Sequence, residues 1–327
     1  MHVCIVIDAT IPPTLYGGTE RVVYWLGKGL HHLGHRVTFL ARPNSRCDFA
    51  EIIALNPAIS LDSQIPAGTD IVHLHSGTDT PHNFPFCQTL HGNTRQAQTF
   101  HPNTIFVSQS HASNHGATAF VHNGLDPDDY GPPDLTRHSG NLAFLAKAAW
   151  RVKNVRGAIE VARKAGKKLD IMGGHRLNFK MGFRLTLDWN CHFHGMIGGE
   201  EKNRLLQQAG GLVFPVRWPE PFGVAVIEAL YFGLPVFATP YGALPELVDD
   251  ANGFLSTSCT ELAEEAARAD HYDRHAIHAG WQKRFTHLHM AKKYLSYYDQ
   301  ILSDQALHSD LIHAPAVRSS DLLDWTR

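Results

Sequence analysis

Short apolar runs alternate with longer segments of helical periodicity along this chain, and the alternation occurs twice. In the first array, an apolar run at residues 2–8 is followed by a segment over 19–34, in which Val22, Leu26 and Leu30 recur at helical spacing. A second array of the same kind follows in the other half of the chain. Strands that alternate with helices form parallel sheets covered by helices on both faces. The pattern therefore predicts an α/β protein with two doubly wound domains.

A stretch rich in Gly, Pro and Asp separates the two arrays at residues 122–140, and we interpret it as a linker. We expect a first domain over residues 1–135 and a second over residues 136–285. A further helix is expected over about residues 286–303, because apolar residues there recur at helical spacing. The polar residues 304–327 that follow are expected to form a loose tail.

Composition narrows the class of protein. The 327 residues carry a net charge of −2, so charge gives no reason to expect nucleic acid as a partner. No apolar run approaches membrane-spanning length, and the run before Asp8 is too short for a signal peptide. The five cysteines are scattered without CxxC spacing. We therefore expect reduced, mostly buried thiols and a cytoplasmic protein.

The stretch PVRWPEPFGVAVIEALYFGLPVFATPYGALPE, residues 215–246, contains two glutamates with seven residues between them, Glu220 and Glu228. Glu220 precedes a proline, which favours extended backbone outside a helix. Glu228 lies about one turn inside a helix expected to end near Phe232, where it suits hydrogen bonds to the two hydroxyls of a ribose. The alternative interpretation is an amphipathic helix with two solvated carboxylates.

The start of this helix lies between the two glutamates, and its first turn presents backbone N–H groups. Gly223 permits close approach of the backbone. The amides from about Phe222 to Val226, that of Val224 included, would bind an anion such as phosphate. Glu220, on the preceding loop, would contact the group beyond the phosphates. A nucleotide sugar consists of ribose, diphosphate and sugar in that order, so the stretch predicts a site for such a donor.

From Glu220 to Leu255 the sequence EPFGVAVIEALYFGLPVFATPYGALPELVDDANGFL resembles the signature of the family-4 retaining glycosyltransferases, where two glutamates at this spacing fill these roles. The resemblance covers most of the chain, from Val3 to about Leu302. It implies the GT-B fold, in which two Rossmann-like domains face a central cleft. Open α/β sheets bind their ligands at the carboxyl ends of their strands, so the cleft between the two domains is the expected site. The resemblance further implies that the last helix packs back on the first domain.

Gly17 and Gly18 precede another helix start, in the segment YGGTERVV. We expect Thr19 to be the N-cap of that helix and Gly34 to end it. Two glycines there suit close contact with a phosphate or sugar, and a tight turn is the alternative. The segment lacks the GxGxxG spacing of nicotinamide dinucleotide sites. It resembles the Gly-Gly-x-Glu-Arg start of the same family, which implies that Gly17 and Gly18 approach the donor diphosphate.

A departing nucleoside diphosphate develops negative charge, which fixed cations can neutralise. The family mostly uses an Arg and a Lys in a Gly-Arg-x4-Lys-Gly pattern, and the stretch resembling it here is FLAKAAWRVKNVRG. Lys147 stands where Arg is usual, and Lys153 lies six positions further on rather than five. We assign both lysines to the diphosphate, with Arg151 as a competitor for the second role. The alternative is that they are surface lysines near a helix start.

His91 ends a predicted strand and precedes Gly92, so it lies at the ligand-binding edge of the first sheet. The family often has a histidine there beside the donor sugar, and we assign His91 to the reacting centre. His73 and His75 alternate onto one face of another strand, but no third ligand with fitting spacing accompanies them, so we expect no metal site. The histidines of the last third of the chain are expected to form a solvated face: His271, His275, His278, His287 and His289.

With this resemblance, the sequence predicts a metal-independent enzyme without a cofactor, which transfers a sugar with retention from a donor such as a UDP- or GDP-sugar. The expected acceptor is a sugar, a lipid-linked precursor or a small molecule, recognised by loops at residues 10–16 and 76–85. Weak association with a membrane surface stays open, although the last helix has few cations. The alternatives are a GT-B nucleotide-sugar epimerase and a non-catalytic sugar-nucleotide-binding protein, the latter suggested by Lys147 in place of arginine.

Overall fold

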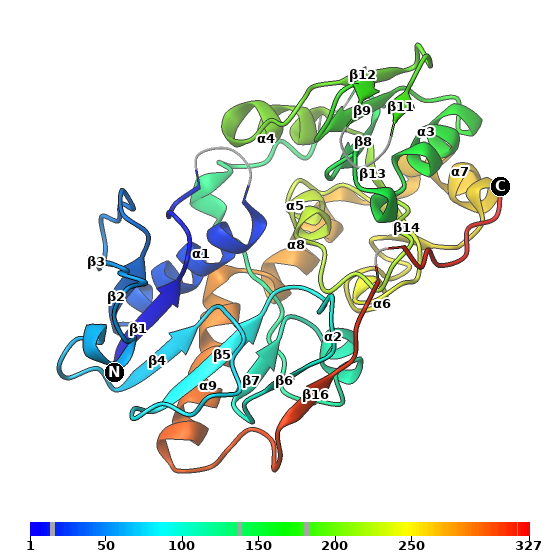
Figure 1. The fold of residues 1–327 in the computed structure, drawn as a ribbon. Helices are drawn as coiled ribbons and strands as arrows, with labels where there is room; N and C mark the ends of the chain where they lie inside the picture. The colour runs from blue at the N-terminus through cyan, green and yellow to red at the C-terminus, as the bar shows by residue number, and fades with distance from the viewer. Residues whose placement is uncertain (14–16, 137–138, 180–182, 319) are drawn as a thin grey trace. The chain divides into compact units, whose positions relative to one another are not determined.

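The computed structural model describes residues 1–13, 17–136, 139–179, 183–318 and 320–327. These residues divide into two units, which can be followed along the chain in Figure 1. Unit 1 consists of Met1–Asp126 and Phe285–Val317, and unit 2 consists of Pro127–Arg284 and Arg318–Arg327.

The chain enters unit 2 after Asp126, earlier than the boundary expected at residue 135. Pro127–Asp129 form a short 3-10 helix, η2. Tyr130 is buried in unit 2, where its ring centroid lies 5.3 Å from that of Tyr231. The composition of the linker marked the region, and the packing of Tyr130 on Tyr231 attaches the second half of this linker to the second unit.

Unit 1 is built on a six-stranded parallel sheet in the order β3-β2-β1-β4-β5-β7. The central strand β1 is buried along its whole length, as expected of an apolar run with neighbours on both sides. The strands are β1 (His2–Ile7), β2 (Arg36–Ala41), β3 (Glu51–Ala54), β4 (Ile71–Leu74), β5 (Phe86–Leu90) and β7 (Thr104–Phe106).

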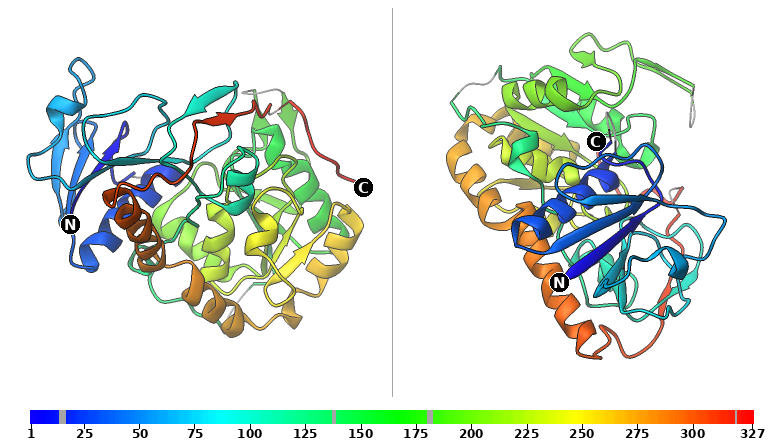
Figure 2. Two further views of the ribbon diagram at one scale, coloured as in Figure 1. Left: turned by 90° about the horizontal axis from the view of Figure 1, so that it is seen from below. Right: turned by 90° about the vertical axis from the view of Figure 1, so that its left-hand side faces the viewer.

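Helices α1 (Gly18–His32) and α9 (His287–Leu302) pack against each other in unit 1, and Figure 2 shows α9 in orange beside α1 in blue. Their approach is close, because a Cβ atom on Gly29 would lie 2.7 Å from the carbonyl oxygen of His287. The C-terminal helix is thus part of the first unit, although Pro127–Arg284, which precede it in the sequence, belong to the second.

The sheet of unit 1 has a second buried face, away from α1. Phe39 on β2 faces α1, since a Cβ atom on Gly27 would lie 2.3 Å from its ring, and the next residue, Leu40, therefore points to the other side. There the segment between β3 and β4 covers the sheet. The buried apolar cluster on that side contains Cys4, Val6, Leu40, Val72, Leu74 and Phe86, with Ile53, Leu55, Leu61, Ile65 and Phe84 packed against it.

Residues 304–327 do not form the loose tail expected from their polar composition. β16 (Ile312–Ala314) pairs with β6 (Gln98–Phe100) in an antiparallel ladder, with both ends of β16 buried (Figure 1). Further along, the amide of Leu323 donates to the carbonyl of Arg217 in unit 2 at 3.0 Å. Backbone hydrogen bonds hold much of this segment to the rest of the chain, and side-chain composition does not reveal such bonds.

Unit 2 contains a second six-stranded parallel sheet, in the order β12-β9-β8-β13-β14-β15. A small antiparallel hairpin follows β9. The strands of the sheet are β8 (Leu142–Leu145), β9 (Leu169–Met172), β12 (Cys191–Phe193), β13 (Gly211–Phe214), β14 (Val236–Ala238) and β15 (Gly253–Leu255), and those of the hairpin are β10 (Leu177–Asn178) and β11 (Arg184–Leu185).

Four helices of unit 2 pack in two pairs, α3 with α7 and α5 with α8. The chain leaves β8 toward β9 and leaves β13 in the opposite direction, toward β14, so right-handed crossovers place α3 and α5 on opposite faces. The helices of this unit are α3 (Val155–Lys164), α4 (Gly199–Gln208), α5 (Val224–Tyr231), α6 (Leu244–Leu247), α7 (Cys259–Ala267) and α8 (Arg274–Arg284). The remaining short helices are α2 (Gln109–Ser113), η1 (Asp62–Gln64), η3 (Arg151–Lys153) and η4 (Ala269–His271).

The predicted fold class is confirmed, since each unit has a parallel sheet of doubly wound topology. The five cysteines are unpaired, and all but Cys47 are buried. Within the described residues, no helix combines the length and the apolar character needed to cross a membrane.

Candidate functional site

Doubly wound sheets bind ligands where two adjacent strands send their connections in opposite directions. In unit 2 these strands are β8 and β13, and in unit 1 they are β1 and β4. The site residues expected from the sequence follow these strands or their direct neighbours. Lys147 and Lys153 follow β8, Glu220 and Glu228 follow β13, Gly17 and Gly18 follow β1, and His91 follows β5, beside β4.

The structure brings Lys153 and Glu220 into direct contact. The ammonium nitrogen of Lys153 lies 2.6 Å from Oε2 of Glu220, and the indole of Trp218 donates to the same oxygen at 2.6 Å. The Lys153 ammonium also lies 5.2 Å from the ring centroids of both Phe214 and Trp218, and 5.5 Å from that of Trp150. Glu220 is only 7% exposed. An ion pair enclosed by aromatic rings is fixed in position, because every partner is itself packed.

The backbone of Glu220 is held as firmly as its side chain. Its carbonyl accepts a hydrogen bond from the amide of Ala243 at 2.9 Å. A Cβ atom on Gly242 would lie 2.2 Å from both the nitrogen and the carbonyl oxygen of Glu220. Gly242 also has a φ of 63°, so two constraints require glycine at this position. The YGALPE turn of the sequence therefore serves to place Glu220.

Glu228 is contacted by two residues that the sequence did not suggest. Lys202 on α4 forms an ion pair with its Oε1, and the hydroxyl of Tyr130 donates to the same oxygen at 2.7 Å. Glu228 is 6% exposed and Lys202 is 4% exposed. Lys202 precedes Leu205 and Leu206 by three and four residues, so a lysine on the apolar face of a helix was the available signal. For Tyr130, in the linker, the sequence offers no comparable signal.

The start of α5 lies between the two glutamates, as predicted. Gly223 is the residue before the helix and has a φ of 102°, which favours glycine. Phe222 is 3% exposed, so its side chain belongs to the core and is not available to a ligand. The amide of Val226 donates to the carbonyl of Gly223 at 2.9 Å and is not available for an anion, contrary to expectation. The amide of Val224 lies in the first turn, where helical carbonyls do not accept.

Lys147 lies on an exposed turn, and none of its described contacts is with Lys153 or Glu220. The carbonyl of Lys147 accepts a hydrogen bond from the amide of Trp150 at 2.9 Å, and the amide of Ala148 donates to the carbonyl of Gly173 at 2.8 Å. This turn accommodates the extra residue between the two lysines. Arg151, the competitor for the second cation, is exposed, whereas Lys153 is partly buried beside Glu220.

A hollow of about 660 Å³ lies at the switch point of unit 1. Thr19 from the first turn of α1, His75 after β4 and His91 after β5 all line it, together with the segment 92–98. Gly17, rather than the expected Thr19, is the N-cap of α1. A Cβ atom on Gly17 would lie 2.8 Å from the Cβ of Pro13, whereas one on Gly18 would meet open space. Gly17 is therefore required by packing, and Gly18 leaves room at the helix start.

His91 and His75 form a hydrogen-bonded pair beside this hollow. Nδ1 of His75 and Nε2 of His91 are 2.8 Å apart. Burial lowers the pKa of His91 to about 4. Burial, together with His73 and His91 nearby, lowers the pKa of His75 well below its usual range. Both rings are neutral at pH 7, so His91 can orient a ligand by hydrogen bonding without adding positive charge.

His73 has a structural role. Its Nδ1 lies 2.7 Å from the hydroxyl of Tyr298 on α9, and its Nε2 lies 2.8 Å from the hydroxyl of Thr89. With both ring nitrogens occupied, His73 has none to offer a metal ion, although it stacks on His75 with ring centroids 4.2 Å apart. Among the residues that the structure describes, no group of three or more His, Cys, Asp or Glu side chains is placed to hold a metal ion.

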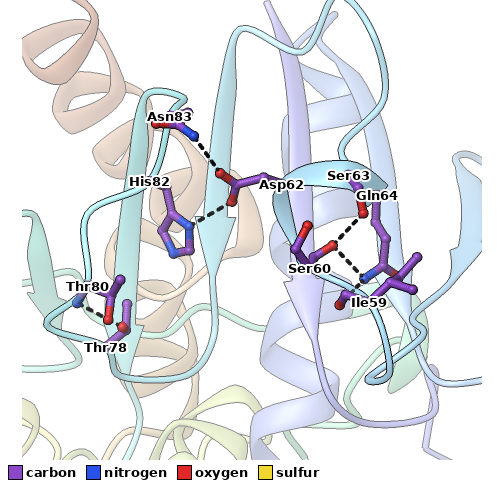
Figure 3. A network of polar contacts seen from close by, with 9 residues as sticks. All are labelled: Ile59, Ser60, Asp62, Ser63, Gln64, Thr78, Thr80, His82 and Asn83. Atoms are coloured by element: carbon purple, nitrogen blue, oxygen red, sulfur yellow. Dashed lines mark hydrogen bonds and ion pairs between the residues drawn. The ribbon is translucent and has the colours of Figure 1, made fainter.

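The loop over residues 76–85, which we expected to recognise the acceptor, is anchored by polar contacts (Figure 3). Asp62 accepts hydrogen bonds from His82 at 3.1 Å and from Asn83 at 3.2 Å. Gln64 stabilises the segment that carries Asp62 by donating to the carbonyl of Ser60 at 3.2 Å. Of the other expected acceptor loop, residues 14–16 lie outside the described residues.

One of the C-terminal histidines is not on a solvated face. His287 is 5% exposed, and its Nε2 lies 3.2 Å from Nδ1 of His32 on α1. It also approaches the carboxylate of Asp126, with 3.7 Å between Nδ1 and Oδ1. The packing of α9 on α1 buries this position, and helical periodicity within α9 alone did not show that. The other members of the group are partly or fully exposed: His271, His275, His278 and His289.

Comparison with known proteins was informative for the second unit and for the fold. Residues 135–271 match the family described as Glycosyl transferases group 1, and this segment contains Lys147, Lys153, Lys202, Glu220 and Glu228. No curated protein matches the sequence.

Several solved structures share the fold of the whole chain. AviGT4, a glycosyltransferase involved in avilamycin A biosynthesis, is 22% identical with a TM-score of 0.78, and the match covers 95% of this chain and 99% of the AviGT4 chain. Sucrose-phosphate synthase from Thermosynechococcus elongatus is 16% identical with a TM-score of 0.69, covering 93% and 100%. Anabaena Alr3699/HepE, in complex with UDP and glucose, is 16% identical with a TM-score of 0.61, covering 92% and 100%. The chain therefore has the GT-B fold, and its residues 135–271 match the family described as Glycosyl transferases group 1.

Proposed function

We propose that this protein is a retaining glycosyltransferase, which moves a sugar from a nucleoside diphosphate sugar to a hydroxyl group of an acceptor without a metal ion. One observation carries the proposal. Two glutamates, each more than nine-tenths buried and each paired with its own lysine, lie on either side of the start of α5, at the switch point of unit 2. Buried, paired carboxylates beside a helix N-terminus suit a ligand with hydroxyl groups on both sides of a diphosphate.

Each part of the donor has a partner in this arrangement. The ribose hydroxyls would donate to Glu228, which Lys202 and Tyr130 hold in place. The diphosphate would accept from the amide of Val224 and from Lys153, with Lys147 closing on it from the exposed turn. The ammonium of Lys153 has three N–H donors, so a bond to Glu220 leaves others for phosphate oxygens. Glu220 would contact the hydroxyls of the sugar.

The chemistry follows from this placement. The bond between the anomeric carbon and the phosphate oxygen breaks, and the acceptor oxygen forms a bond to that carbon on the same face. The departing phosphate oxygen takes the proton of the acceptor hydroxyl. Charge that develops on the leaving group is stabilised by Lys153, Lys147 and the start of α5. His91, neutral at pH 7, would orient the sugar, and the configuration of the anomeric carbon would be retained.

The first test is a search for the donor. Thermal shift measurements with UDP, GDP and ADP, and then with their sugars, should identify one nucleotide that stabilises the protein. Transfer is then assayed with saccharide, lipid-linked and small-molecule acceptors in the presence of EDTA. NMR of the product should show the anomeric configuration of the donor. A product of inverted configuration, or activity that EDTA abolishes, contradicts the corresponding part of the proposal.

The two glutamates should separate in a kinetic experiment. Glu228→Ala should raise the KM for the donor, because it removes the partner of the ribose, whereas Glu220→Ala should mainly lower kcat. Glu264→Ala, an exposed substitution on α7, is the control and should change neither. Unchanged kinetics in both site variants would remove these assignments. Formation of an isomerised sugar without acceptor would instead indicate an epimerase, and donor binding without transfer would indicate a binding protein.

A further inference from the structure

A hollow of about 510 Å³ in unit 2 is distinct from the site just described. It lies between the loop after β8, the start of α3 and the last residues of the chain. None of Lys147, Lys153, Glu220 and Glu228 lines it. Its described lining carries one carboxylate, Glu160, against five guanidinium groups, those of Arg151, Arg156, Arg184, Arg217 and Arg327. Only Arg327 approaches that carboxylate, with 3.6 Å between Nε and Oε2.

Arg184 gives this hollow its specific character, because it is an arginine only 7% exposed and no acidic residue pairs with it among the described contacts. Its two terminal nitrogens donate to Thr186 at 2.8 Å and to the carbonyl of His175 at 3.0 Å. Its Nε is buried and has no hydrogen-bond partner among the described residues. Burial and the like charge of Arg156 both lower the pKa of Arg184. An anion bound in the hollow would offset the repulsion between these two guanidinium groups.

The start of α3 contributes donors to the same hollow. Asn154, with a φ of 52°, precedes the helix, and its side-chain oxygen accepts from the amide of Gly157 at 3.1 Å. The side-chain nitrogen of Asn154 is buried and without a partner among the described residues. The amides of Val155 and Arg156 lie in the first helical turn, where no helical carbonyl accepts them. A helix of 10 residues adds its dipole to the charge of the arginines.

Two indole rings, those of Trp150 and Trp325, also line the hollow. We propose that it binds a phosphorylated saccharide, with the phosphate group held by Arg156, Arg184 and the start of α3, and the sugar ring beside the indoles. The arginines match a phosphate group in charge and geometry, and aromatic surfaces suit the C–H groups of a sugar ring. This site goes beyond the proposed transferase activity and does not depend on it, because its test is a binding measurement without a donor.

Calorimetry at low ionic strength tests the proposal, with inorganic phosphate, glucose 6-phosphate and glucose as probes. Wild-type protein should bind glucose 6-phosphate more tightly than inorganic phosphate and should not bind glucose measurably. Arg156→Ala, an exposed substitution at the start of α3, should weaken binding of both phosphates about tenfold, the effect of one charged hydrogen bond. Arg163→Ala is the matched control, an exposed arginine in the last turn of the same helix, and should bind as the wild type does.

A separate variant distinguishes this hollow from the donor site. Lys147→Ala should leave this phosphate binding unchanged, because Lys147 is outside the lining. Without ligand, Arg156→Ala should unfold at a temperature no lower than that of the wild type, since it removes a repulsion with Arg184. No binding to the wild type, or equal weakening in Arg156→Ala and Arg163→Ala, overturns the site. Weakening in Lys147→Ala assigns the binding to the donor site instead, and equal affinity for the two phosphates overturns the saccharide part.

Discussion

Lys202 is a lysine at 4% exposure whose partner, Glu228, is nearly as buried. A buried ion pair contributes little net stability when whole, but removal of one partner leaves the other charge uncompensated. We predict that Lys202→Met lowers the free energy of unfolding by about 3 kcal/mol. The double variant Lys202→Met with Glu228→Gln should recover most of this loss, because both charges are then gone. Urea unfolding of the two variants measures the difference.

The control for this cycle is Lys283→Met, an exposed substitution on α8 that should change stability by less than about 0.5 kcal/mol. If the double variant is no more stable than Lys202→Met alone, the pair is not the source of the loss. Donor binding adds an independent readout. The double variant should fold and still fail to bind the nucleotide, since it lacks the carboxylate assigned to the ribose.

Gly242 links a single backbone position to the placement of Glu220. Gly242→Ala should cost more than about 1 kcal/mol, because it combines left-handed backbone strain with a Cβ atom 2.2 Å from the Glu220 backbone. It should also lower kcat by displacing Glu220. Gly166→Ala is the matched control in the same unit: its φ of 67° is similar, but its Cβ would meet open space. That variant should show the strain alone, with normal turnover, and equal loss of kcat in both variants would contradict the prediction.

At this scale the sequence predicted the residues that lie near one another along the chain or follow adjacent strands. Glu220 and Lys153 could be found because parallel strands bring the segments after β8 and β13 to one edge. The ion pair between these two residues could not be predicted, since it depends on the rotamers of Trp218 and its aromatic neighbours. Tyr130 was missed for a similar reason, because only tertiary packing brings the linker to Glu228.

Among the elements, α9 connects the end of the chain to the centre of unit 1. Tyr298 on this helix bonds to Nδ1 of His73 at 2.7 Å, and both side chains are fully buried. Tyr298→Phe should lower the free energy of unfolding by about 1–3 kcal/mol, because it leaves a buried nitrogen without its partner. Tyr24→Phe on α1 is the control, because its hydroxyl contacts the exposed Asp48 at 3.5 Å and the half-buried Cys47 rather than a fully buried partner. Equal losses in urea unfolding would contradict a specific role for the buried bond.

The elements themselves were predictable to the extent that their side chains carried a pattern. β1 and α5 follow directly from an apolar run and from helical spacing between a glycine and a proline-containing stop. β16 was not predicted, because a three-residue strand is too short to show alternation and it pairs with an equally short β6. The same limit applies to the hairpin of β10 and β11, which has two residues in each strand.

The two units of the whole molecule differ in their buried histidines. All the described histidines with a clearly lowered pKa belong to unit 1: His35, His73, His75, His91, His101, His111 and His115. Burial is the main cause in each case, and it lowers the pKa to about 3 for His73 and His111 and to about 4 for His91. Of these, His73, His111 and His115 are buried in the core of unit 1 and must stay neutral for that core to remain packed.

This distribution predicts that acid unfolds unit 1 before unit 2. Well above pH 6.5, the ordinary pKa of histidine, these rings are neutral in the folded and unfolded states and add no pH dependence. As the pH falls below that value, the unfolded state binds protons that the folded state excludes. Each buried histidine therefore lowers the free energy of unfolding by up to about 1.4 kcal/mol per pH unit until its folded pKa is reached.

Hydrogen exchange at pH 5 and pH 7, corrected for the intrinsic rate, should show protection lost from β4, β5 and α2 while β13 and α5 keep theirs. Of the six tryptophans, Trp25 alone belongs to unit 1, and it is fully buried. Its fluorescence gives a second readout in a variant whose other five tryptophans are replaced by phenylalanine. Earlier loss of protection in unit 2, or equal loss in both units, would contradict the assignment of acid sensitivity to these histidines.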